Sequence, residues 1–232
     1  MLQKLKALWA KPVPVSIEDQ KFDQIMGIAK SIAKKSPGAL RELVRALLLP
    51  LQAEHMVAVA EQVQHDAPAE IRYWDFFFRI ENSSDYYLRS TPREVLTLGR
   101  DVLLPTVWNR SRYFNALALI GTGKSLGPWS QDEDNHSVSL LLPWRIGFVN
   151  GGNHSITAGI LMSEGEVVAS EVFDMTALLQ RVRCDGKTYR DIDTNRVLGE
   201  VTDARRAAVF EIGRLMLNAG LTADSAAVNS PL

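Results

Sequence analysis

The sequence of 232 residues contains a single cysteine, Cys184, so it can form neither an intramolecular disulfide nor a cysteine-based zinc site. So little cysteine fits a reducing compartment, and we expect a cytoplasmic location. No run of 18 apolar residues occurs, because Pro50 breaks the longest candidate, so we expect no membrane span. Residues 1–11 interleave lysines with apolar residues and lack the cleavage site of a secretion signal, which predicts an amphipathic helix there.

Neither sign of charge dominates the sequence. The 26 Lys and Arg residues balance 27 Asp and Glu residues, giving a formal net charge of -1. This balance argues against a protein whose whole surface binds nucleic acid, so any such contact has to be local. Apolar residues make up 46% and charged residues 23%, which is typical of a soluble globular protein with one or two domains.

The hydrophobic pattern divides the chain into regions of different character. Apolar residues recur at helical spacing up to about residue 64, with a break at Ser36–Gly38 and a second helix that we expect to end at Pro50. Short β-rich runs follow residue 95, and residues 203–218 have the pattern of a helix. We therefore predict a helical region over residues 1–70, an aromatic connecting segment over 71–94, an α/β core over 95–182, and a C-terminal helix and tail over 183–232.

One segment matches a nucleotide P-loop in its residue types but not in the structure that its neighbours predict. Residues 118–125 end in Gly-Lys-Ser, with Lys124 in the position of the phosphate-binding lysine. A P-loop must run straight into a helix, whose first amides face the phosphates. Here Gly127 and Pro128 follow at once and disfavour a helical turn. We therefore interpret the segment as an ordinary turn.

The strongest local pattern lies between residues 144 and 174. It predicts a strand, a tight glycine loop, a helix and a second strand, over Arg145–Val149, Asn150–Asn153, His154–Leu161 and Val167–Phe173 respectively. Such an arrangement places unpaired backbone N–H groups and the positive end of a helix where an anion can dock. Gly151 and Gly152 permit positive backbone angles and close approach of a ligand.

The polar residues beside these glycines suggest roles in binding. Asn153 or Ser155 can cap the helix, and His154 can contact a phosphate or act as a base. The alternative is a structural turn in which the histidine bonds only to backbone. The residues alone leave both interpretations open.

The run from Phe148 to Ser155, followed by a small-residue helix, resembles the nucleotide-contacting loop of the ParB and sulfiredoxin-like fold. The short run Asp174–Leu179 resembles the helix that follows the next strand in that fold. The likeness covers about residues 95–182, and we suspect an uncharacterised bacterial family that carries this core. It implies a nucleotide ligand, ATP or another nucleotide with Mg²⁺.

This sequence departs from that family at two positions. Asn153 stands where sulfiredoxins carry the catalytic cysteine, which argues against their chemistry. Ser155 replaces the arginine that clamps phosphate, so another cation has to compensate. The nearest candidates in sequence are Arg110, Arg112, Lys124 and Arg145.

Acidic residues outnumber basic ones around the loop. Residues 126–175 hold seven acids and one arginine, a balance that disfavours a bare polyanion and favours a metal-bound nucleotide or a cationic partner. Asp132 and Asp134 alternate with His136, so an extended chain would point all three to one side as metal ligands, although a solvated acidic loop is the commoner meaning. His136 and His154 form a candidate acid/base pair for phosphoryl chemistry.

We therefore expect an α/β (α+β) protein: a small mixed sheet of ParB/sulfiredoxin-like type with an N-terminal helical region and a C-terminal helix. The predicted function is binding of a nucleotide or phosphorylated small ligand at Gly151–Ser155, and whether metal-assisted phosphoryl transfer follows stays open. The first alternative is a non-catalytic interaction or regulatory protein of a bacterial defence or mobile-element system, with a protein partner. The second is a DNA-associated module that uses the basic residues Lys30, Lys34, Lys35, Arg41 and Arg45.

Overall fold

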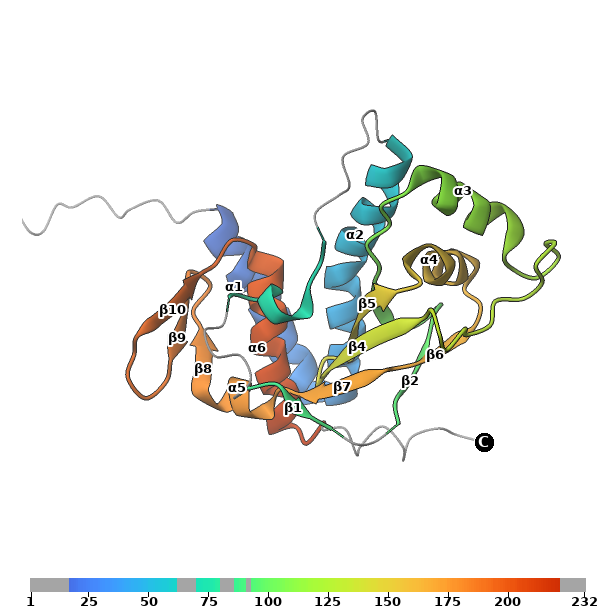
Figure 1. Ribbon diagram of the computed structural model, residues 1–232. Coiled ribbons are helices and arrows are strands. Elements are labelled where there is room, and N and C mark those ends of the chain that lie inside the picture. Colours follow the sequence, from blue (N-terminus) through green and yellow to red (C-terminus); the bar gives the residue numbers. More distant parts are fainter. Residues whose placement is uncertain (1–16, 62–69, 80–85, 91–92, 222–232) are drawn as a thin grey trace, which may run out of the picture.

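The computed structural model describes residues 17–61, 70–79, 86–90 and 93–221. Within them the chain forms six α-helices and three β-sheets, which confirms a mixed α and β fold with helices at both ends (Figure 1). The amphipathic helix expected over residues 1–11 and the end of the expected C-terminal tail lie outside the described residues.

The N-terminal region is a helical pair. Helix α1 (Ile17–Lys35) ends just before Ser36. A 3₁₀ turn, η2 (Pro37–Ala39), follows, and α2 (Leu40–Glu61) begins directly after it. The expected end at Pro50 is wrong, since α2 continues for eleven residues beyond this exposed proline. Burial of apolar side chains on both sides of Pro50 offsets the lost backbone hydrogen bond.

Helix α2 is buried along one face, and Pro37–Glu61 is long and apolar enough by composition to cross a membrane. Its buried face packs against the rest of the protein through Leu48, Gln52 and Met56. The Gln52 amide donates to the Leu103 carbonyl at 2.5 Å, which ties the helix to the sheet. This packing is compatible with a soluble protein.

The central sheet has five strands in the order β1-β7-β4-β5-β3. The strands are β1 (Leu88–Arg89), β7 (Glu171–Asp174), β4 (Ser137–Leu142), β5 (Ile146–Gly151) and β3 (Val102–Leu104). The pairs β3/β5 and β4/β7 are parallel, whereas β4/β5 and β1/β7 are antiparallel. The central strands are apolar along nearly their whole length because helices cover both faces of the sheet.

Two apolar clusters lie on the two faces of this sheet. One contains Leu141, Phe148 and side chains of α1, α2 and α6 (Ala204–Asn218). The other contains Leu140, Val149 and side chains of α4 (Asn153–Met162). Helix α3 (Arg110–Leu119) packs on α4 and forms the outermost layer on that side (Figure 1).

The aromatic segment lies at the centre of the larger cluster. A 3₁₀ turn, η3 (Tyr73–Asp75), precedes Phe76, Phe77 and Phe78, all of which are buried. Their rings contact Phe148 in the central sheet, Trp144 in the turn after β4, Tyr189 in a second, smaller sheet and Phe210 in α6. The segment therefore joins the helical pair, the sheet and the C-terminal helix into one shared core.

The strand expected over residues 167–173 is split into two. Strand β6 (Glu166–Val168) pairs with β2 (Val95–Thr97), whereas β7 pairs with β1 and β4. A hydrogen bond from the Ser90 amide to the Val172 carbonyl extends the β1/β7 ladder. The chain changes partner between Ala169, whose amide donates to the Glu94 carbonyl, and Ser170, whose amide donates to the Val138 carbonyl.

The structure contains a second sheet over residues 182–200, which the sequence pattern did not predict. After α5 (Thr176–Arg181), strands β8 (Val182–Cys184), β9 (Thr188–Asp191) and β10 (Val197–Glu200) form an antiparallel meander in chain order. These short strands contain many charged residues, so their alternation is weak. The C-terminal region is therefore a small sheet followed by α6.

Candidate functional site

The predicted strand, glycine loop and helix are confirmed as β5, Gly152 and α4. Gly152 has a left-handed conformation with φ 72° and occupies the N-cap of α4 without a side-chain cap. Among the described residues, the structure shows no acceptor for the backbone amides of Asn153, His154 and Ser155. The first turn therefore presents the unpaired donors and positive helix end that favour an anion.

The inner side of this bend is filled by the protein's own chain. A β-carbon on Gly152 would lie 2.1 Å from His136 Cδ2, and one on Gly151 would lie 2.5 Å from the Asn135 carbonyl oxygen. The sequence had suggested that these glycines permit close approach of a ligand. In the structure, residues 135–136 make that close approach instead. Any ligand has to approach the outer side of the first turn of α4.

His136 is a buried packing residue with an unpartnered nitrogen. Its Nδ1 accepts from the Asp132 amide at 2.8 Å, and its ring stacks on Trp129 with centroids 5.0 Å apart. The residue is 4% exposed, and Nε2, which carries the hydrogen when Nδ1 accepts, has no partner in the described part of the chain. Burial lowers the pKa of His136. These contacts do not place it opposite His154 as an acid/base partner.

The acidic turn does not assemble a metal site. Asp132 Oδ1 accepts from the Asp134 amide at 3.2 Å, and the Asp132 carbonyl accepts from the Asn135 and His136 amides. In the described residues no three His, Cys, Asp or Glu side chains come together to hold a metal. The alternation of Asp132, Asp134 and His136 forms a tight turn here, so the expected extended geometry is wrong.

Asn153 and His154 bind the loop between β3 and α3. Asn153 Oδ1 accepts from the Thr106 amide at 2.6 Å, and His154 Nε2 accepts from the Asn109 amide at 3.2 Å. Asn109 in turn caps α3, since its Oδ1 accepts from the Arg112 amide at 2.9 Å. Neither Asn153 nor Ser155 caps α4. The two α4 side chains therefore position α3, a relationship that the sequence pattern did not show.

An aromatic and a cationic side chain border His154. The Trp108 ring packs edge-on against the imidazole, 5.5 Å between centroids, and Arg112 Cζ lies 5.2 Å above the Trp108 ring. Burial and the nearby Arg112 charge lower the pKa of His154. Arg110 and Arg112 are exposed at the start of α3, so of the four cations proposed from the sequence these two lie on the helix beside the loop.

The other two proposed cations are engaged elsewhere. Arg145 precedes β5, six strand residues from Gly152, and its guanidinium pairs with Glu94 at 2.5 Å and with Asp101 at 3.8 Å. The strand separates it from α4 by about 20 Å, so the assignment of Arg145 to the ligand is wrong. Lys124 Nζ donates to the Leu117 carbonyl, and its segment follows a helix and not a strand, which confirms that it is no P-loop.

Ser155 faces the protein interior. The Trp129 indole Nε1 donates to the Ser155 carbonyl at 2.9 Å and to its hydroxyl at 3.1 Å. The hydroxyl is therefore already engaged as an acceptor, while its hydrogen remains for another contact. Ser155 therefore offers a ligand its backbone amide and its hydroxyl hydrogen, but no hydroxyl lone pair other than one that Trp129 does not use.

A second group of polar residues lies at the same edge of the sheet on the opposite face. Asn150 Nδ2 donates to Ser139 Oγ at 2.8 Å, and Ser139 Oγ lies 3.3 Å from Glu171 Oε2. Glu171 also accepts from Arg89 at 2.6 Å. This chain of contacts satisfies the fully buried Ser139 hydroxyl and fixes Asn150 just before the glycine loop.

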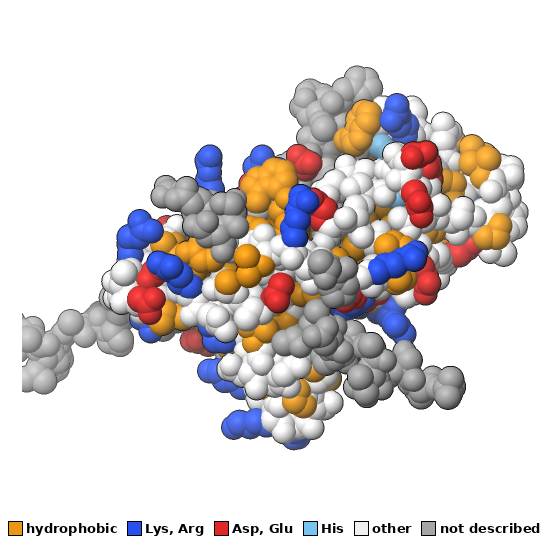
Figure 2. Space-filling view, turned by 60° about the horizontal axis from the view of Figure 1, so that its bottom comes forward, with side chains coloured by type: hydrophobic (Ala, Val, Ile, Leu, Met, Phe, Trp, Pro, Cys, Tyr) orange, Lys and Arg blue, Asp and Glu red, His pale blue; other side chains and the backbone are white. Residues whose placement is uncertain are grey.

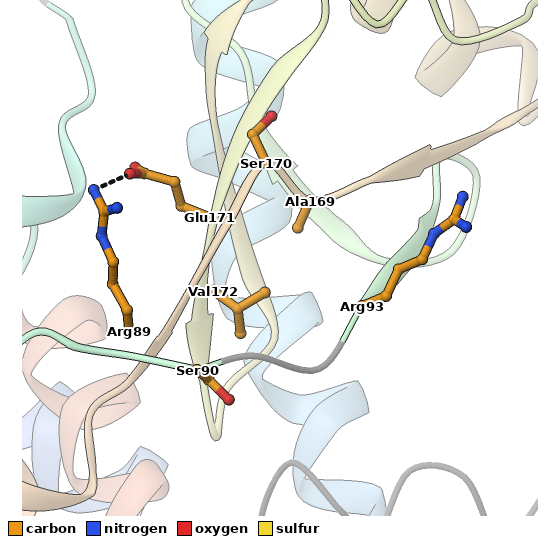
Figure 3. Close-up of a pocket in the computed structure, with 7 residues that line it drawn as sticks. All are labelled: Arg89, Ser90, Arg93, Ala169, Ser170, Glu171 and Val172. Carbon is orange, nitrogen blue, oxygen red and sulfur yellow. Dashed lines mark hydrogen bonds and ion pairs between the residues drawn. The ribbon is translucent and has the colours of Figure 1, made fainter.

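A hollow of about 250 Å³ lies beside β1 and the start of β7 (Figure 3). Figure 3 shows Arg89 pointing toward Glu171, while Arg93 points away from the side chains around Ser170. Among the residues drawn around the hollow, Arg89 and Glu171 are thus already paired with each other. The hollow is lined by residues of β1, β7 and their flanking turns, and none of them belongs to the loop at Gly152.

A family model described as a family of unknown function, DUF6710, matches residues 8–223, and the chain belongs to this family. Neither a curated protein nor a solved structure matches the chain. No similarity to ParB or sulfiredoxin proteins emerges from these comparisons.

Proposed function

We propose that the protein binds a nucleotide or another phosphorylated small ligand, with its phosphate on the first turn of α4. The observation that carries this proposal is the uncapped helix start behind Gly152, whose first three amides have no acceptor among the described residues. Backbone N–H groups and the helix dipole together favour a phosphate at such a position. The buried, unpartnered Nε2 of His136 lies beside the same N-cap.

The side chains around this turn suit a phosphorylated ligand. Arg112 supplies a permanent positive charge close enough to His154 to lower the pKa of its imidazole. It compensates for the arginine that Ser155 replaces in the ParB and sulfiredoxin-like pattern. Trp108, 45% exposed, offers an apolar surface beside the charge. The β5-loop-α4 arrangement is the part of the resemblance that supports a nucleotide as the ligand.

The hydrogen bonding of His154 favours binding over base catalysis. Because Nε2 accepts from the Asn109 amide, the neutral ring carries its hydrogen on Nδ1 and can donate it to a phosphate oxygen. A general base needs a free acceptor nitrogen, and here that nitrogen already holds the β3–α3 loop. Magnesium would have to arrive with the nucleotide, because the described residues form no cluster of three ligands.

Thermal stabilisation by ligands tests the proposal. We expect ATP, ADP or inorganic phosphate, each with and without MgCl₂, to raise the Tm, by mass action on the folded state. Asn153→Asp should abolish the shift, because it keeps an acceptor for Thr106 but places a negative charge among the amides. Arg112→Ala should weaken it, whereas Arg100→Ala, an exposed arginine near the other end of the sheet, should not.

Two outcomes would overturn the proposal. One is the absence of a shift with every phosphate compound. The other is an equal shift in the wild type and in Asn153→Asp. The first outcome, together with a stable complex recovered with a cellular protein, would favour the alternative of a non-catalytic interaction protein.

A further inference from the structure

One face of helix α2 is apolar and exposed. Leu49 and Val57 are 44% and 48% exposed, and three exposed alanines lie in line with them at helical spacing. We call this set the α2 stripe: Ala46, Leu49, Ala53, Val57 and Ala60. The helix is apolar enough by composition to cross a membrane, yet only 28% of its most apolar window is buried. Because a helix that is apolar on nearly all sides is normally buried, the α2 stripe is a surface for a further element.

The charges beside the α2 stripe are negative. From Ala46 to Glu61 the helix has no Lys or Arg, and its two charged residues, Glu54 and Glu61, are exposed. Arg45, before the stripe, is half-buried and donates to the Gly99 carbonyl at 2.8 Å. On the face drawn in Figure 2, by contrast, basic and acidic side chains are interspersed. An occupant with an apolar face and positive flanks fits the α2 stripe, whereas a second copy of α2 would bring its own glutamates against it.

The first eleven residues of the sequence have this chemistry. Their large apolar residues fall on one arc of a helical projection, and the lysines lie on both sides of this arc. The apolar residues are Leu2, Leu5, Leu8 and Trp9, and the lysines are Lys4, Lys6 and Lys11. No acidic residue occurs before Glu18. The segment therefore complements the α2 stripe in both hydrophobicity and charge.

The connection to α1 is long enough for the segment to fold back. Pro12 and Pro14 disfavour a helix that continues into α1 and favour an extended link. The five residues 12–16 can span up to roughly 17 Å when extended. Helices α1 and α2 run in opposite directions on either side of η2, so the start of α1 lies toward the same end of the protein as the second half of α2 (Figure 1). Ala53, Val57 and Ala60 belong to that half.

We propose that residues 1–11 form an amphipathic helix that docks on the α2 stripe of the same chain. Its apolar arc covers Leu49 and Val57, and its lysines lie close to Glu54 and Glu61. The alanines of the stripe allow the docked helix to approach closely, because they carry no bulky side chain. This docking is independent of ligand binding at α4, which covers the opposite face of the sheet.

Cross-linking in the full-length chain tests this docking. Cys184 is buried, so a short bismaleimide reacts only with introduced thiols. In the variant with Leu5→Cys and Val57→Cys we expect a link within one chain, identified by mass spectrometry of the linked peptides. Leu161→Cys is the matched control for Val57→Cys, because Leu161 is 53% exposed and lies on α4. The link at position 57 should form about tenfold faster than at position 161, since docking raises the effective concentration of the two thiols.

Charge reversal tests the contribution of the glutamates. Glu54→Lys should slow the link at position 57 about threefold, the loss expected for an exposed ion pair, and added NaCl should also slow it. Glu200→Lys reverses an exposed charge on β10 and should leave the rate unchanged. A second measurement uses no introduced thiol. Leu5→Glu should release the segment and increase the binding of an apolar fluorescent dye to the folded chain, whereas Gln3→Glu, on the polar side of the segment, should not.

Three results would contradict this docking. A link between two chains would show that the segment occupies the α2 stripe of a second copy. Equal rates at positions 57 and 161 would show that the segment has no fixed docking site. Unchanged dye binding in Leu5→Glu would show that residues 1–11 do not cover the α2 stripe, and binding to anionic phospholipid vesicles would then assign the segment to a membrane surface.

Discussion

The imidazole of His136 lies directly against the α-carbon of Gly152, with Cδ2 occupying the space that a β-carbon would take. Two segments sixteen residues apart in sequence thus meet at the start of α4. The Trp129 ring stacks on the face of the imidazole, and the Asp132 amide fixes its orientation. The conformation of the glycine loop, and with it the start of α4, therefore depends on the turn before β4.

Replacing Gly152 by alanine should cost more than replacing a glycine of similar backbone angle. Gly123 has φ 81° and nothing within 4 Å of an added β-carbon, whereas Gly152 has φ 72° and meets His136. We expect about 1–2 kcal/mol of destabilisation for Gly123→Ala from the left-handed backbone alone. Gly152→Ala should lose a further 1–3 kcal/mol, roughly, from overpacking, as measured by urea denaturation. Equal losses would contradict the role given to His136.

Asn153 should contribute to stability through its carbonyl oxygen. Asn153→Ala leaves the amide of Thr106, a buried residue, without its acceptor and should lower the free energy of unfolding by about 1–3 kcal/mol. Asn153→Asp keeps an acceptor and should lose much less in urea denaturation. If both variants are equally unstable, the hydrogen bond to Thr106 does not support the β3–α3 loop as the structure indicates.

Stability should fall as the pH decreases below about 6.5. Burial lowers the pKa of His55, His136 and His154 in the folded state, so the unfolded chain binds protons first as the pH falls. The stabilisation from these neutral histidines is fully present above the pKa of histidine in the unfolded chain, and it is lost as the pH falls below that pKa. Asp191, whose pKa is lowered to about 2 by hydrogen bonds from the Thr194 amide and the Arg181 side chain, stays ionised throughout.

Thermal denaturation between pH 7.5 and 5.5 measures this effect. His154→Gln keeps an acceptor for the Asn109 amide but does not titrate, so its Tm should depend less on pH than that of the wild type. An identical pH dependence in the two proteins would show that His154 does not contribute to it.

Arg145 should matter for folding and not for ligand binding. Its side chain is 13% exposed and pairs with Glu94, itself 11% exposed, so Arg145→Met leaves a buried carboxylate without a partner. We expect a loss of about 3–5 kcal/mol in urea denaturation, the usual cost of removing one member of a buried pair. The Tm shift with phosphate compounds should persist. If the variant is stable but shows no Tm shift with phosphate compounds, Arg145 does contribute to ligand binding.

The thiol of Cys184 should be unreactive in the folded protein. Burial raises the pKa of this thiol to about 12, so almost no thiolate exists at neutral pH. Iodoacetamide should therefore label the protein in urea but not in buffer, as read by mass spectrometry. Rapid labelling of the native chain would show that the β8 strand opens readily.

Local patterns in the sequence were sufficient to predict several elements. The run before Gly151 became β5, the residues after Gly152 became α4, and the aromatic segment became the shared core. These features depend on near neighbours or on hydrophobic burial. The end of α2 was predicted wrongly because tertiary packing around Pro50 outweighs the local preference of proline.

The site was harder to predict because its contacts join distant segments. Nothing in the sequence near Asn153 indicates that its side chain accepts from Thr106, or that His136 fills the space beside Gly152. The alternation of Asp132 and Asp134 also had two structural meanings, and a turn prevailed over an extended chain. Asn109 did carry a usable signal, since an asparagine before a helical run is a common N-cap.

The division of residues 166–174 between two sheets has a consequence for the outer edge of the protein. Ala169 donates its amide to the Glu94 carbonyl just before β2, whereas the next residue, Ser170, donates its amide to the Val138 carbonyl of β4. Because consecutive residues of an extended chain point in opposite directions, two neighbouring residues can bind two different neighbours. The two-stranded sheet is thus tethered covalently to the middle of the five-stranded one, and a displacement of β2 would pull on β4 through these two residues.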